Sequence, residues 1–267
     1  MGKPITHLHV PMIDAEDVIR HLAKKEKHWK AGRSAHALTN LWFNSEGLPK
    51  SVRSIFVSHP VFQSAELVDA FLEREVDLRT PGRHSQADIL AIIALKDRLA
   101  IVAVEGKAGE PFGKEYVHEW LDGRDETDVR LTALCDMLGL SVEAAKPLRY
   151  QLLHRAASAI FEAKRYRSKL AVMLVQSFAR DNASFEDFAK FMRAVGIKRE
   201  IEREQLLGPV ELRDVSFYAA WVDEKVPEFD TKLSYLDDLR RYADRGSKWC
   251  DHLRRWCDKR QFRRSNK

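Results

Sequence analysis

The feature of the sequence that most restricts the fold is a pair of apolar segments separated by a short charged turn. Residues 87–95 read ADILAIIAL and residues 99–104 read LAIVAV, and only Lys96, Asp97 and Arg98 lie between them. Short apolar runs that are rich in Ile and Val are typical of buried strands, and a tight polar turn between two of them is typical of a hairpin. The sequence therefore predicts a central, buried β-hairpin.

The segments around this hairpin predict an α/β fold. Apolar residues at helical spacing predict helices over residues 14–27, 34–43, 63–73, 128–138, 147–166 and 185–195, and one or two more after residue 233. A third apolar run over residues 171–178 and an alternating run over residues 215–222 predict further strands. Residues 51–57 are too short to assign. The order of helix, hairpin strands, long helix and strand indicates a mixed sheet flanked by helices.

The composition agrees with a globular protein. Of the 267 residues, 45% are hydrophobic and 32% are charged, which is ordinary for this class. No apolar run reaches the roughly 18 residues that a membrane span needs, and the first residues lack the apolar stretch of a signal peptide. We therefore expect a cytoplasmic protein that does not bind membranes. Three cysteines argue against a disulfide framework, and Cys250 with Cys257 lacks the four converging ligands of a zinc site.

The positive charge is concentrated near the C-terminus. Residues 239–267 carry a net charge of +8, whereas the whole chain carries +5, so the remainder is slightly acidic. A basic segment favours polyanionic partners such as nucleic acid. A solvated helix face would explain the same charges equally well.

Three charged residues converge at one end of the predicted hairpin. Asp88 begins the first strand, and the second ends in Glu105-Gly106-Lys107. Antiparallel pairing brings Asp88 beside Glu105, and residues two apart in a strand point to the same side. Two neighbouring carboxylates favour a Mg²⁺ ion, with Gly106 as a possible backbone ligand, and a nearby lysine can orient a metal-bound water. The alternative is an ion pair at the strand ends.

This pattern resembles the PD-(D/E)xK superfamily of restriction-enzyme-like nucleases. The superfamily has an Asp at the start of one strand and Glu-x-Lys at the end of the next, and its core runs helix, three strands, helix, strand. Residues 63–178 are similar to that order, with residues 76–78 as the first, outer strand. Residues 149–155 (RYQLLHR) resemble the Gln-bearing helix of the exonuclease-like branch, and the same run resembles uncharacterised bacterial proteins. The resemblance covers somewhat under half of the chain.

The resemblance implies a role for each residue of the motif. Asp88 and Glu105 would bind Mg²⁺, with Mn²⁺ as a substitute, and Lys107 would assist the attacking water. Gln151 and Arg155 would position the substrate. Two positions depart from the pattern: Ala87 stands where the motif has Pro, and Arg155 stands where the exonuclease branch has Tyr. A cationic Arg155 could instead hold a phosphate through two hydrogen bonds.

Other residues are weaker candidates for the site. Ser34 is expected to cap a helix, and Arg33 beside it could bind phosphate at that helix N-terminus. Ser85, in the loop expected before Asp88, could contact phosphate or serve only the turn. Glu66 and Glu73 lie on the helix expected before the sheet, where a solvated face is the simpler interpretation.

The sequence thus predicts an N-terminal helical segment over residues 1–62, a nuclease core over residues 63–200, and a C-terminal strand with a basic helical extension over residues 201–267. The expected activity is Mg²⁺-dependent hydrolysis of nucleic acid, with DNA favoured over RNA. A homodimer is one option for cutting both strands. The alternative is a nuclease-like module that only binds nucleic acid or a protein.

Overall fold

The computed structural model describes residues 15–20, 22, 29, 33–113, 115–121, 123–179 and 182–224. The chain divides into two units, residues 1–225 and 226–267, and every described residue belongs to the first. The helices predicted after residue 233, the basic segment and the pair of C-terminal cysteines lie outside the described residues. Of the helix predicted over residues 14–27, the structure describes a 3₁₀ helix, η1 (Ala15–Arg20).

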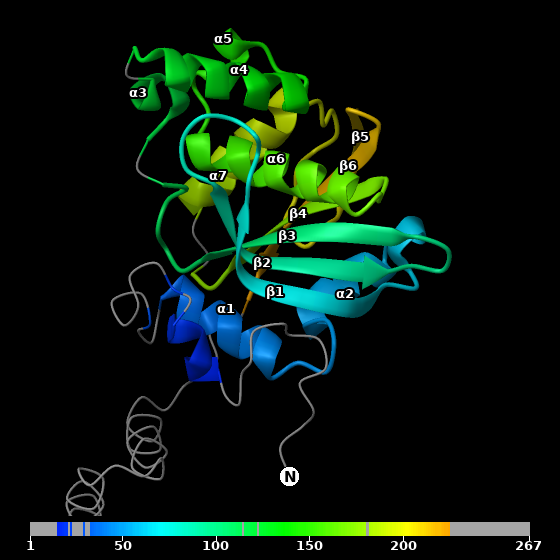
Figure 1. Ribbon diagram of the computed structural model, residues 1–267. Helices are drawn as coiled ribbons and strands as arrows, with labels where there is room; N and C mark the ends of the chain where they lie inside the picture. Colours follow the sequence, from blue (N-terminus) through cyan, green and yellow to red (C-terminus); the bar gives the residue numbers. More distant parts are fainter. Residues whose placement is uncertain are drawn as a thin grey trace, which may run out of the picture. The chain divides into compact units, whose positions relative to one another are not determined.

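The core is a six-stranded mixed sheet in the order β1-β2-β3-β4-β6-β5 (Figure 1). The strands are β1 (Glu66–Val76), β2 (Ser85–Ala94), β3 (Leu99–Lys107), β4 (Leu170–Ser177), β5 (Leu207–Leu212) and β6 (Val215–Asp223). Strands β1, β2 and β3 pair antiparallel, β3, β4 and β6 pair parallel, and β5 pairs antiparallel with β6. The fold is therefore α/β, as the sequence predicts.

Helices cover both faces of the sheet. Figure 1 shows α1 (Ser34–Phe43) and α2 (Lys50–Val57) on one face, with the short helix η3 (Pro60–Phe62) following them. The opposite face carries α3 (Val117–Trp120), α4 (Asp125–Leu138), α5 (Val142–Ala145), α6 (Tyr150–Arg165) and α7 (Asn182–Ala194). Each layer encloses its own cluster of buried apolar side chains. The described helices include none that is long and apolar enough to cross a membrane.

The predicted hairpin is confirmed as the centre of the sheet. Strands β2 and β3 pair antiparallel from Ile89↔Val104 to Ala94↔Leu99. The side chains from Ile89 to Ile93 are all buried, because helices pack on both faces. A strand that is covered on both faces reads as a continuous apolar run rather than as an alternating one, which is why its sequence is so distinctive.

The hairpin opens at one end into a fork. The register of β2 with β3 ends at the pair Ile89↔Val104. Beyond it, β2 continues beside β1, and β3 continues beside β4. In Figure 1 the loop joining β1 and β2 rises beside α6. The two arms of the fork are residues 85–88 of β2 and residues 105–107 of β3.

The helix predicted over residues 63–73 is wrong, because β1 occupies this segment. Its apolar residues fit a helical stripe, but β1 pairs with β2 along its length, and Ala70 and Leu72 alternate with less buried neighbours. Charged residues are well tolerated on an edge strand, where they discourage pairing with other chains. Long-range pairing therefore outweighs local helical preference here, and the first strand does not lie over residues 76–78.

Helix α2 and strand β5 also differ from the prediction, as do the short helices η3, α3 and α5, which were not predicted. Residues 51–57, which were left unassigned, lie in α2, and β5 was not predicted. Pro209 in β5 suits an edge strand, where a missing N–H breaks no ladder. Because β5 and β6 belong to the sheet, the core extends past residue 200 and includes the strand that was assigned to a C-terminal extension.

Candidate active site

The fork opens into a cavity of about 550 Å³, which we call the fork cavity. Side chains reach it from β1, β2, β3, α6 and the start of α1. The charged and amide side chains that line it are Arg33, Glu73, Gln86, Asp88, Glu105, Lys107, Glu110, Gln151 and Arg155. Gly106 also lines it. The predicted site residues other than Ser85 and Glu66 therefore gather around one cavity.

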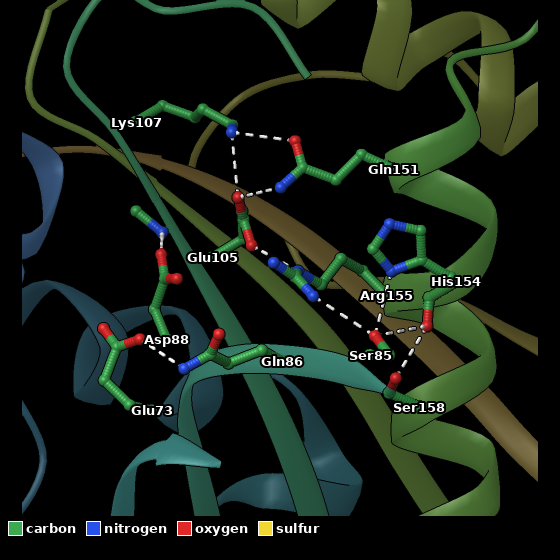
Figure 2. Close-up of polar contacts among 11 residues, drawn as sticks. Glu73, Ser85, Gln86, Asp88, Glu105, Lys107, Gln151, His154, Arg155 and Ser158 are labelled. Atoms are coloured by element: carbon green, nitrogen blue, oxygen red, sulfur yellow. Dashed lines mark hydrogen bonds and ion pairs between the residues drawn. The ribbon is translucent and has the colours of Figure 1, made fainter. Parts of the chain in front are cut away.

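Glu105 lies at the centre of this group. Its Oε1 accepts hydrogen bonds from Lys107 Nζ at 2.8 Å and from Gln151 Nε2 at 2.6 Å, and its Oε2 accepts one from Arg155 Nε at 2.5 Å (Figure 2). The side chain of Gln151 also accepts a hydrogen bond from Lys107 Nζ at 3.1 Å. Glu105 is 4% exposed and Lys107 is 3% exposed. Burial raises the pKa of Glu105, but Arg155 and Lys107 outweigh it and lower that pKa to about 2.

Asp88 holds the two arms of the fork together. Its Oδ2 accepts a hydrogen bond from the backbone N–H of Gly106 at 2.8 Å. Because the strands have separated here, this N–H has no partner in β2, and the carboxylate takes the place of a backbone acceptor. Burial and the negative charge of Glu105 raise the pKa of Asp88 to about 7. An added cation in the cavity would therefore favour its ionised form.

Glu73 is a third carboxylate at the fork. The register of β1 with β2 places it opposite Asp88, and its Oε2 accepts a hydrogen bond from Gln86 Nε2 at 2.9 Å. Its φ of 50° lies in the left-handed region, which is uncommon for a residue other than glycine and unusual within a strand. Burial and the charge of Asp88 raise the pKa of Glu73 to about 8. The sequence offered Glu73 only as a weaker candidate and favoured a solvated helix face for it, because this segment was predicted to be a helix; it lies in β1 and lines the fork cavity.

Ser85 contacts two residues of α6, Arg155 and His154. It lies within β2 and is 1% exposed, so the prediction that it occupies a loop is wrong, and it does not line the fork cavity. Its Oγ accepts a hydrogen bond from Arg155 Nη1 at 3.2 Å and lies 2.9 Å from His154 Nδ1. Burial and the charge of Arg155 lower the pKa of His154 well below its usual range, so the imidazole is neutral. Burial lowers the pKa of Arg155, but Glu105 and Asp88 outweigh it, so the guanidinium stays charged.

The other side of the cavity is formed by the start of α1. Arg33 is the N-cap residue of this helix, so the prediction that Ser34 caps it is wrong. Both residues line the fork cavity, which places a helix N-terminus at its wall. Gly106 allows this close packing, because a Cβ at that position would come within 3.2 Å of the Leu38 side chain.

The donor set fits a divalent cation with oxygen ligands. Among the described residues, no group of three or more His, Cys, Asp or Glu side chains is placed to hold a metal together. Mg²⁺ generally uses only one or two carboxylates and completes its shell with water and substrate phosphate. Asp88 and Glu105, with the Gly106 carbonyl, are the residues that would hold it. The raised pKa of Asp88 and of Glu73 marks a region that gains from a cation.

Comparison with known proteins identifies one family. Residues 11–226 match the model of DUF6946, which is described as a domain of unknown function. The matched span contains all six strands and every residue lining the fork cavity. No curated protein and no solved structure matches the chain.

Proposed function

We propose that this chain, which belongs to the DUF6946 family, is a metal-dependent phosphodiesterase that cleaves nucleic acid. The observation that carries the proposal is the gathering of Asp88, Glu105 and Lys107 at the open fork of an otherwise apolar sheet. Buried charges of this kind cost desolvation free energy, and apolar residues would often stabilise the fold as well or better. Their presence at one cavity therefore favours a chemical role.

The residues divide the expected chemistry between them. A bound Mg²⁺ would polarise a phosphoryl oxygen and lower the pKa of a water ligand. Lys107, which is held by Glu105 and Gln151, can orient the attacking water or offset the negative charge that develops on the phosphate. Arg155 uses Nε and Nη1 for Glu105 and Ser85, which leaves Nη2 for a phosphate oxygen.

The order of elements supports the resemblance to PD-(D/E)xK nucleases. Helices α1 and α2 precede the three antiparallel strands β1, β2 and β3, and α6 then leads into β4, which pairs parallel with β3. This is the order expected of that core, with α1 and α2 in the place predicted for a helix over residues 63–73. We extend the proposal to a cytoplasmic enzyme that prefers DNA and that dimerises if it cuts both strands.

The hydrogen bonds of Glu105 favour a second function. Both of its oxygens contact protein cations or amides, as in a network that serves only to fix the structure. A module that binds nucleic acid without cleaving it would be compatible with that network. Metal-dependent cleavage separates the two functions.

The test uses the full chain with supercoiled plasmid, linear duplex, single-stranded DNA and RNA, in Mg²⁺, Mn²⁺ or EDTA. We expect metal-dependent cleavage that falls at least about 100-fold in Asp88→Asn and in Lys107→Met. The matched controls are Asp97→Asn and Lys96→Met in the exposed turn at the other end of the hairpin, and both should cleave normally. No cleavage of any substrate, or equal cleavage by all variants, would overturn the proposal.

A further inference from the structure

A second cavity, of about 530 Å³, lies beside the fork cavity. Tyr150 and His154 of α6 line it, whereas their neighbours Gln151 and Arg155 line the fork cavity. Adjacent rows of side chains on one helix therefore separate the two cavities. The other walls come from the β1–β2 loop over residues 81–84 and from α3 and α4. We call this second cavity the arginine pocket.

One wall of the arginine pocket is a row of aromatic rings. Trp120 and Tyr150 stack with ring centroids 3.9 Å apart and an interplanar angle of 9°. The His154 ring follows, with its centroid 5.0 Å from that of Tyr150. All three side chains are only partly buried. Such rings offer flat, partly accessible faces on which a nucleobase can stack.

The pocket is also positively charged. Three arginines, Arg83, Arg124 and Arg130, line it together with a single carboxylate, Glu126. In the part of the chain that the structure describes, neither Arg83 nor Arg130 forms an ion pair with a carboxylate. Arg149, the N-cap residue of α6, has a different setting, since it pairs with Asp187 at 2.7 Å. Arg83 and Arg130 therefore bring to the pocket two guanidinium groups that have no acidic partner among the described residues.

Arg130 gives the strongest indication of a ligand. It is 6% exposed, and its Nε donates a hydrogen bond to Tyr150 Oη at 2.6 Å. Its Nη1 donates to Thr80 Oγ1 at 2.9 Å and to the Pro81 carbonyl at 2.8 Å. Its Nη2 has no hydrogen-bond partner among the described residues. A buried guanidinium with only neutral partners is costly, and a bound anion would offset that cost.

We propose that the arginine pocket binds an unpaired nucleotide, with the base against Trp120 and Tyr150 and the phosphate at Arg83 and Arg130. Its volume falls within the range of about 300–1,000 Å³ that is usual for small-ligand sites. The inference rests on the proposed function, since it makes the pocket a subsite for a strand whose scissile phosphate lies in the fork cavity. It also names the substrate class as a single strand or an unpaired region, because neighbouring bases already cover both faces of a base inside a duplex.

The residues that lie between the two cavities support this proposal. Ser85 Oγ contacts His154 Nδ1 on the side of the arginine pocket and accepts from Arg155 Nη1 on the side of the fork cavity. The residues on either side of Ser85 divide in the same way, since His84 of the β1–β2 loop lines the arginine pocket and Gln86 of β2 lines the fork cavity. The two cavities are therefore separated only by neighbouring residues of α6 and by the segment from His84 to Gln86, as one strand that contacts both would require.

The test measures binding without cleavage. The full chain in EDTA is titrated into a fluorescein-labelled single-stranded oligonucleotide, and fluorescence anisotropy gives the Kd at several salt concentrations. We expect binding about tenfold weaker in Trp120→Ala, since a stacked base contributes this much, and weaker binding with a shallower salt dependence in Arg83→Ala. The control is Lys164→Ala, an exposed cation of α6 that lines neither cavity, and it should bind normally.

Two further measurements test whether the loss of binding is specific to base stacking and to a nucleotide. Trp120→Phe should restore most of the affinity, which a misfolded variant could not do. A nucleoside monophosphate should compete with the oligonucleotide far better than inorganic phosphate does. Equal competition by phosphate, or equal affinities of Trp120→Ala and Lys164→Ala, would overturn the inference.

The two proposals can fail separately. A chain that cleaves nucleic acid but binds normally after Trp120→Ala retains the proposed function and loses the arginine pocket as a subsite. A chain that never cleaves but loses binding after Trp120→Ala retains the pocket and loses the nuclease.

Discussion

Strands β2 and β3 have two halves of opposite character. In the paired half, from Ile89↔Val104 to Ala94↔Leu99, backbone hydrogen bonds join the strands and almost all side chains are apolar and buried. In the fork, the strands have separated, and Asp88, Glu105 and Lys107 occupy the positions that follow. The same two strands thus carry the centre of the hydrophobic core and the candidate active site.

The difference shows what each half can contribute. Burial of apolar area in the paired half stabilises the fold by roughly 25 cal/mol for each Å² removed from water. The fork leaves backbone groups and charges that must be satisfied by side chains, as when Asp88 accepts from the Gly106 N–H. Perturbed pKa values follow from that arrangement and are typical of functional sites. Substitutions in the two halves should therefore separate stability from activity.

The largest effect is expected from Glu105→Ala. Removing this carboxylate leaves Lys107 and Arg155 buried without their counter-charge, which should lower the free energy of unfolding by about 3–5 kcal/mol and abolish cleavage. The matched variant in the paired half is Ile101→Ala, which should cost about 2–5 kcal/mol through the cavity it creates. Cleavage per folded molecule should be unchanged in Ile101→Ala.

Urea denaturation and cleavage assays on the same preparations measure both quantities. Full activity per folded molecule in Glu105→Ala would show that the fork is not the catalytic region. A loss of activity in Ile101→Ala that exceeds its loss of folded protein would show that the two halves are not separable.

A smaller effect is expected from pH. The pKa of Asp88 is raised from 3.8 to about 7 and that of Glu73 from 4.5 to about 8, so the native state keeps protons that the unfolded state has already released. The free energy of unfolding should therefore fall as pH rises from about 4 to about 8. Glu105 acts oppositely: its pKa is lowered to about 2, so its contribution is present above its unfolded value and is lost as pH falls toward 2.

Asp88→Asn should flatten the decline in stability between about pH 4 and about pH 7, whereas Asp97→Asn in the exposed turn should leave it unchanged. Mg²⁺ should reduce the decline in the wild-type chain, because binding to ionised carboxylates stabilises the native state. Urea midpoints across this pH range measure the slope. A slope equal in wild type and Asp88→Asn would remove Asp88 as its source.

The paired half could be predicted from sequence because its signal is local. Two apolar runs joined by a short turn can pair in few ways, so the spacing alone brought Asp88 and Glu105 to one end of the sheet. Strand β1 could not be predicted in this way. Its charged residues suit an exposed helix as well as an edge strand, and only pairing with β2 decides between them.

The same distinction holds for the site. Glu73 joins the carboxylates only through the register of β1, so the incorrect helix prediction made a solvated face the simpler interpretation of this residue. The supporting role of Ser85 depends on α6 lying across β2. The stack of Trp120 on Tyr150 joins residues from two different helices, and no local pattern indicates such a contact. Side chains that meet only through tertiary packing have no characteristic spacing in the sequence, so the sequence alone does not predict their contact.

The smallest expected effect compares two buried hydroxyl groups. Ser85 holds Arg155 and His154 at the fork, whereas Ser168 Oγ donates to the Leu99 carbonyl at 2.7 Å, at the far end of the paired half. Ser85→Ala and Ser168→Ala should each lower the free energy of unfolding by about 1 kcal/mol, because each leaves buried groups without a hydrogen-bond partner. Only Ser85→Ala should also lower kcat, by a few-fold, since Arg155 keeps its contact with Glu105 but loses its second anchor. Equal kcat values in the two variants would limit Ser85 to a structural role, whereas a selective loss would extend the functional half of the hairpin to the buried residue behind the fork.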